Sequence, residues 1–109
     1  MTLFRNERQF MNAIASNARE LGFRVFHPEI SQGSEAGFPD LTIVGHGVVL
    51  FIETKGPGKN ARITPKQQAW IDALTAAGQT ALIAYPDDFN FVMDLLQTAY
   101  ETALLEEPA

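Results

Sequence analysis

Two short apolar segments separated by a Gly-His-Gly sequence constrain the fold of this chain more than any other feature. The first spans Asp40–Val44 and the second Val48–Lys55, and both are rich in β-branched residues. This pattern predicts two antiparallel strands joined by a tight turn at residues 45–47. Because the second segment is apolar on both faces, we expect it to be a central strand of the sheet.

The register of this hairpin is expected to bring ionisable side chains together. If the turn has two residues, counting outward along the ladder places Asp40 opposite Glu53, with Cβ atoms about 5 Å apart on one face. Lys55 shares that face. The Thr54 side chain is expected to point away and to leave its backbone carbonyl near the site.

Two carboxylates this close raise each other's pKa unless a cation lies between them. The chain has no cysteine, which excludes thiolate zinc sites, so oxygen ligands remain. Mg²⁺ prefers one or two carboxylates with water and phosphate completing its shell, which suits Asp40, Glu53 and the Thr54 carbonyl. A divalent ion beside Lys55 predicts hydrolysis of a phosphodiester bond.

The segments around the hairpin have helical patterns. Asn6 followed by Gln9 predicts the N-cap of a helix spanning Glu7–Leu21. Its expected buried stripe consists of Met11, Ile14, Ala18 and Leu21. Glu7 falls at the edge of that stripe, either as a site residue or as an exposed acid favoured by the helix dipole.

Further elements follow the hairpin and complete the expected fold. Residues 24–27 are β-prone, Thr64-Pro65 predicts the start of a helix that ends at Ala77, and residues 80–85 read as another buried strand. A C-terminal amphipathic helix is indicated by Phe89, Val92, Leu96, Ala99, Ala103 and Leu104. We therefore expect an α/β fold of order α-β-β-β-α-β, with a mixed central sheet flanked by helices and an added C-terminal helix.

The length of 109 residues predicts one domain over residues 1–109. We see no apolar segment long enough to cross a membrane and no leader, so we expect no membrane association and a cytoplasmic location. Neither His27 nor His46 enters the expected mechanism, and Trp70 is expected in the core rather than as a base-stacking platform.

The net charge of −5 argues against nucleic acid until its distribution is considered. Residues 1–66 hold all eight basic residues and six acids, whereas residues 67–109 hold seven acids and no base. Lys59, Arg62 and Lys66 lie close to Lys55 in the sequence and are the expected phosphate contacts. A solvated charged loop is the alternative reading of these residues.

The arrangement of these motifs resembles a known nuclease family. Gly37-Phe38-Pro39-Asp40 followed by Glu53-Thr54-Lys55 resembles the PD-(D/E)xK signature, and Thr64-Pro65-Lys66-Gln67-Gln68-Ala69-Trp70 resembles the helix start of its VRR-NUC branch. The resemblance spans about residues 7–91. It implies a restriction-endonuclease-like core in which Asp40 and Glu53 bind Mg²⁺ or Mn²⁺ with the Thr54 carbonyl.

The same resemblance assigns further roles. It implies that Lys55 is the catalytic lysine, that Glu7 supports the site through water or a second metal, and that Gln67 lies nearby; capping alone also explains a glutamine there. The resemblance also implies that stand-alone members are similar to Holliday junction resolvases and pair as homodimers. The family at large includes structure-specific and flap-type nucleases that are often encoded by phages, which points to a bacterial or phage-infected host cell.

We therefore expect an endonuclease that cuts branched or structured DNA, with one or two metal ions per site and possible replication or recombination partner proteins. A nickase, exonuclease or flap nuclease recruited by a partner is an alternative, and a catalytically silent DNA-binding module is another. The intact set of Asp40, Glu53 and Lys55 favours an enzyme.

Overall fold

The computed structural model describes residues 3–28, 35–58 and 61–106, and its elements follow the predicted order. These elements are α1 (Glu7–Glu20), β1 (Arg24–Phe26), β2 (Leu41–Gly45), β3 (Val48–Thr54), α2 (Pro65–Ala76), β4 (Thr80–Ala84), the short 3-10 helix η1 (Pro86–Asp88) and α3 (Phe89–Glu106). None of the described helices combines the length and the apolar character that a membrane crossing requires.

The strands form one mixed sheet in the order β1-β2-β3-β4. The first three pair antiparallel, and β3 pairs with β4 in parallel, so β3 is central as predicted. The hairpin register runs from Gly45 opposite Val48 to Leu41 opposite Ile52, which is the register expected from a two-residue turn. Both turn residues have positive φ, as a primed hairpin turn requires.

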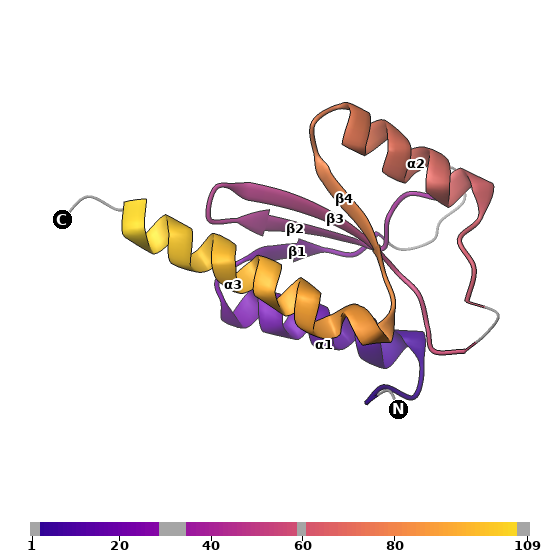
Figure 1. Cartoon of the computed structure of the whole chain (residues 1–109), viewed down its shortest axis with the longest axis horizontal. Helices are drawn as coiled ribbons and strands as arrows, with labels where there is room; N and C mark the ends of the chain where they lie inside the picture. Colours follow the sequence, from indigo (N-terminus) through magenta and orange to yellow (C-terminus); the bar gives the residue numbers. More distant parts are fainter. Residues whose placement is uncertain (1–2, 29–34, 59–60, 107–109) are drawn as a thin grey trace.

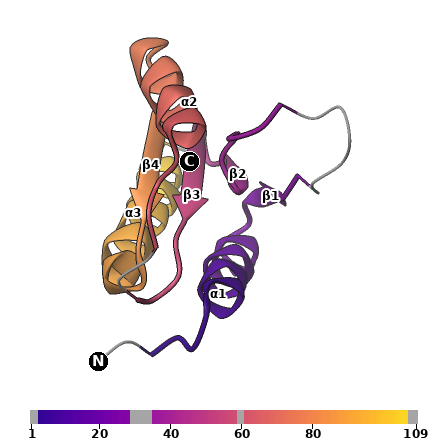
Figure 2. The same cartoon turned by 90° about the vertical axis from the view of Figure 1, so that its right-hand side faces the viewer.

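One face of the sheet carries the main core, which α1 and α3 cover together (Figure 1). The largest fully buried apolar side chains of this core are Phe10, Ile14, Leu41, Ile43, Ile52, Val92 and Leu96. Helix α2 lies over the other face (Figure 2). There the Phe38 ring contacts Phe51 of β3 and Trp70 of α2 edge-on. Trp70 thus packs against Phe38 but is only partly buried, so the expectation that it lies in the core is confirmed only in part.

The predicted stripe of α1 is confirmed for Ile14 and Ala18, which are fully buried, and was wrong for its other two residues. Phe10 is fully buried, whereas Met11 and Leu21 are only partly buried. Phe10 is drawn inward because its ring packs against Phe4 and against Phe89 of α3, at centroid distances of 5.4 and 6.5 Å. The sequence pattern of α1 alone contains no information about these distant rings.

Two other burial predictions were wrong in part. In β4 only Ala84 is buried and Thr80 is exposed, because β4 is the last strand of the described sheet. In α3, Leu104 is 49% exposed because the end of the helix continues beyond the hairpin (Figure 1).

The histidines occupy structural and surface positions, as expected. The His46 ring lies edge-on to Phe23 and Tyr100, and its Nε2 is 2.6 Å from the carbonyl oxygen of Leu21. His46 therefore links the hairpin turn to the end of α1 and to α3. His27 is exposed.

Candidate active site

The predicted site residues gather at one end of the sheet. Strand β3 runs toward this end, and both α1 and α2 begin there (Figure 1). Because side chains at helix starts and strand ends meet at this edge, Glu7, Asp40, Glu53, Lys55 and Gln67 are brought together from distant parts of the chain. Their mutual contacts define the candidate site.

Asp40 is fixed by the last residue of β3. Its Oδ2 accepts hydrogen bonds from the Thr54 backbone N–H and from the Thr54 hydroxyl, both at 2.9 Å. The expectation that the Thr54 side chain points away from the site was therefore wrong. Asp40 precedes the first residue of β2, so strand alternation does not dictate its direction, and its carboxylate turns toward the two donors.

Glu53 of β3 and Lys55, which directly follows this strand, point to the same side, as the alternation predicts. Their side chains form an ion pair with 3.3 Å between Lys55 Nζ and Glu53 Oε2, and both residues are buried. Lys55 Nζ also donates to Gln67 Oε1 at 2.8 Å. The ammonium is therefore held between two elements that enclose the site.

Gln67 performs both of the roles considered for it. As the third residue of α2 it forms a capping box with Thr64, whose side chain accepts from the Gln67 backbone N–H. Its Oε1 accepts from the Thr64 backbone N–H at 2.9 Å and from Lys55 Nζ at 2.8 Å. The helix start thereby fixes the glutamine that orients the lysine.

Burial makes Glu53 the most perturbed group of the site. Desolvation, followed by the nearby Asp40 carboxylate, raises the pKa of Glu53 to about 7, and Lys55 offsets only part of this shift. Oε1 of Glu53 is buried and has no hydrogen-bond partner among the described residues. A buried carboxylate oxygen without a donor is costly unless a cation approaches it.

Glu7 reaches the site from the first turn of α1. Its Oε1 lies 3.4 Å from the Thr54 hydroxyl oxygen. Partial burial and the charge of Asp40 raise the pKa of Glu7, whereas Lys55 and the Thr54 hydroxyl lower it. The structure thus brings Glu7 into the electrostatic environment of the site, as the resemblance implied.

The donor set suits a hard divalent cation. Asp40 and Glu53 supply carboxylate oxygens, and the unpartnered Glu53 Oε1 is the atom that a cation would satisfy. Within residues 3–28, 35–58 and 61–106, no cage of three or more His, Asp or Glu side chains that could hold a metal ion is present. Mg²⁺ needs no such cage, since it retains several waters and accepts one or two protein carboxylates.

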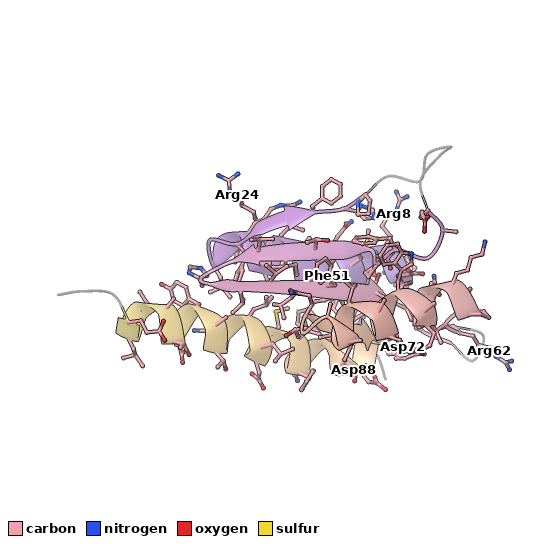
Figure 3. All side chains as sticks on the ribbon, turned by 90° about the horizontal axis from the view of Figure 1, so that it is seen from above. Arg8, Arg24, Phe51, Arg62, Asp72 and Asp88 are labelled. Atoms are coloured by element: carbon pink, nitrogen blue, oxygen red, sulfur yellow. The ribbon has the colours of Figure 1, made fainter. Side chains whose placement is uncertain are left out.

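The structure describes two of the three residues expected to contact phosphate. Arg62 and Lys66 are exposed near the start of α2, and Figure 3 shows Arg62 extending outward at that end of the molecule. Lys59 lies outside the described residues. Arg62 and Lys66 thus lie on the part of the chain that leads from Lys55 to Gln67.

The loop before Asp40 approaches α2 closely at Gly37. This residue has φ +95°, and a Cβ there would lie 2.6 Å from the carbonyl carbon of Lys66. We expect Gly37→Ala to lower the free energy of unfolding by about 2–4 kcal/mol, because backbone strain and a clash with immobile backbone add together.

Gly47→Ala is the matched control for Gly37→Ala in urea unfolding. Gly47 also has a positive φ, +79°, but a Cβ there would meet nothing within 4 Å. Gly47→Ala should therefore lower the free energy of unfolding by about 1 kcal/mol, through backbone strain alone. Equal losses in the two variants would contradict the close approach at Gly37.

The Thr54 hydroxyl is the site group that the sequence interpretation missed. Alternation places Thr54 on the buried face with Leu50 and Ile52, where a hydroxyl must find an acceptor. A threonine at the end of an apolar strand, next to an expected carboxylate cluster, was the available signal.

Comparisons with known proteins agree with this geometry. The model of the VRR-NUC domain matches residues 4–87. A solved structure titled "VRR_NUC domain" is 23% identical, with a TM-score of 0.66 over 84% of this chain and 94% of its own. Another, titled "VRR_NUC domain protein", is 22% identical, with a TM-score of 0.66 over 87% of this chain and 88% of its own.

No curated protein matches the sequence. The structural likeness shows a restriction-endonuclease-like fold. Helix α3 lies beyond the residues that the family model matches. The family match spans well over half of the chain and includes every residue of the candidate site. The chain therefore belongs to the VRR-NUC family of nuclease domains.

Proposed function

We propose that this protein is a metal-dependent DNA endonuclease that hydrolyses phosphodiester bonds. The observation that supports this most directly is the convergence of Asp40, Glu53 and Lys55 around a buried, unpartnered Glu53 oxygen. A buried carboxylate oxygen without a partner destabilises the fold, whereas a bound cation would satisfy it.

Each residue has a distinct part in the proposed reaction. Asp40 and Glu53 would hold Mg²⁺ or Mn²⁺ with the Thr54 carbonyl, and Glu7 would support the site through water or a second ion. When bound, the metal would acidify a water and neutralise charge at the phosphate. Lys55, oriented by Gln67, orients the attacking water or stabilises negative charge that develops on the phosphoryl oxygens.

Several features support a nucleic-acid substrate. All Lys and Arg residues lie within residues 1–66, whereas the acidic residues 67–109 include all of α3. Helix α3 packs with α1 on the face of the sheet opposite α2. In this proposal Arg62 and Lys66, near the start of α2, attract the DNA backbone toward the site, whereas the acidic residues of α3 repel it. We propose branched or structured DNA as the substrate and a homodimer as the active form.

The proposal is tested by cleavage of labelled four-way junction, flap, single-stranded and linear duplex DNA with Mg²⁺ or Mn²⁺. Cutting that EDTA abolishes, strongest on the junction, is expected. Preference for flaps or free ends would instead indicate a flap nuclease or exonuclease. Junction binding without cutting would overturn the autonomous enzyme in favour of a binding module or a partner-dependent nuclease.

The homodimer is tested separately by the mass in solution. A dimer should have a mass near twice 12.0 kDa by light scattering. A monomer that still cuts both strands of a junction would contradict the proposed homodimer and leave the proposed nuclease activity standing.

Arg62→Ala and Lys66→Ala should weaken DNA binding without changing metal affinity. If each residue contacts one phosphate, each substitution lowers the slope of log K against log salt concentration by about one. Fluorescence anisotropy at several salt concentrations measures this slope. Arg19→Ala, at the exposed last turn of α1, is the matched control and should leave it unchanged.

A further inference from the structure

Thr54 connects two carboxylates that come from different parts of the chain. Its hydroxyl lies 2.9 Å from Asp40 Oδ2 and 3.4 Å from Glu7 Oε1, and Thr54 is fully buried. The metal proposal assigned only the backbone carbonyl of this residue. The side chain is therefore a buried polar group with no part in the mechanism so far.

The geometry decides how the single hydroxyl hydrogen is used. Asp40 is the nearer acceptor, and its Oδ2 also receives the Thr54 backbone N–H at 2.9 Å. Two donors from one residue thus hold the same oxygen of Asp40, Oδ2, and neither of them uses Oδ1. Such double anchoring fixes the rotation of the carboxylate, which a single hydrogen bond does not.

We propose that Thr54 is a positioning residue that orients Asp40 for cation binding through its hydroxyl. This inference rests on the proposed metal-dependent function. Hydrogen bonds to ligating carboxylates fix the ligand before the metal arrives, and their loss typically lowers metal affinity or activity by 10–100-fold. The hydroxyl should therefore act mainly on metal affinity rather than on the chemical step.

Two substitutions separate this role from simple packing. Thr54→Val preserves shape but removes the hydroxyl, whereas Thr54→Ser keeps the hydroxyl but removes a buried methyl group. A positioning role predicts that valine impairs the site more than serine. A packing role predicts the reverse, because the serine variant leaves a cavity in the core.

The experiment measures Mn²⁺ binding to the whole protein by titration calorimetry without DNA, together with the Mn²⁺ dependence of cleavage. Thr54→Val should bind Mn²⁺ about tenfold more weakly and recover most of its cleavage rate at saturating metal, whereas Thr54→Ser stays within about twofold of wild type. Urea unfolding shows that both variants are folded.

Two other outcomes have different meanings. If wild type binds Mn²⁺ and Thr54→Val binds it equally well, the positioning role is overturned and the proposed function stands. A loss confined to Thr54→Ser would likewise overturn it in favour of packing. If wild type neither binds Mn²⁺ nor cuts DNA with it, both proposals fall.

Discussion

Asp40→Asn should reduce DNA cleavage by about a thousandfold while preserving the fold. The asparagine oxygen can still accept the two Thr54 donors that now bind Oδ2. Its amide nitrogen would then replace Oδ1, so a hydrogen-bond donor would face the cation. Losing about 4 kcal/mol of metal-derived stabilisation corresponds to this rate change.

Single-turnover cleavage of the preferred DNA measures the effect of Asp40→Asn. Asp94→Asn, an exposed acid of α3, removes the same charge away from the site and should cut normally. Circular dichroism and urea unfolding check the fold of both variants. Cleavage by Asp40→Asn within tenfold of wild type would contradict the assignment of Asp40 as a metal ligand.

Glu53→Gln should make the metal-free protein more stable while abolishing its activity. Burial and Asp40 raise the pKa of Glu53 to about 7, from an ordinary value of 4.5. The folded state therefore retains a proton that the unfolded state has already released between pH 4.5 and 7. Stability falls as pH rises through this window and stays lower above it, by about 3 kcal/mol.

Glutamine cannot ionise, so the variant avoids the cost of a buried charge. At pH 8 in EDTA, we expect Glu53→Gln to unfold at a higher urea concentration than wild type, with a free energy of unfolding about 2–3 kcal/mol larger. This difference should vanish near pH 4. The free energy of unfolding of the variant should still fall slightly as pH rises, because the pKa of Glu7 is also raised. Identical pH profiles of the two proteins would show that Glu53 ionises normally.

Metal addition gives the complementary result for Glu53. Mg²⁺ at pH 8 should stabilise wild type, since it binds the folded state and relieves the carboxylate repulsion. Glu53→Gln should gain little from Mg²⁺. Equal stabilisation of both proteins would place the metal elsewhere.

The hairpin half of the site was predictable because its information is local. The two-residue turn fixes the register, and the register places Glu53 and Lys55 on one face near Asp40. Gln67 was reached by resemblance and by its capping position, since its contact with Lys55 depends on how α2 packs across the sheet. Local pattern alone gives no such distance.

The incorrect expectations share a physical cause. The direction of the Thr54 hydroxyl depends on Asp40, which lies outside the strand and escapes its alternation. The burial of Phe10 depends on Phe89, far along the chain. The exposure of β4 depends on its position in the sheet order. Each is set by tertiary contacts that a periodicity does not encode.

We expect the site to assemble in an order set by the separation of its parts along the chain. The β2–β3 hairpin closes through a two-residue turn, and such hairpins form within microseconds, so it should form before β4, which follows α2 in the chain, pairs with β3. Asp40 and Glu53 would then meet while water still surrounds them and before Lys55 contacts Gln67 of α2. The carboxylates of the site are therefore desolvated when α2 and β4 dock, after the hairpin has formed. Divalent cations present during refolding should accelerate this docking step and leave the rate of hairpin formation unchanged.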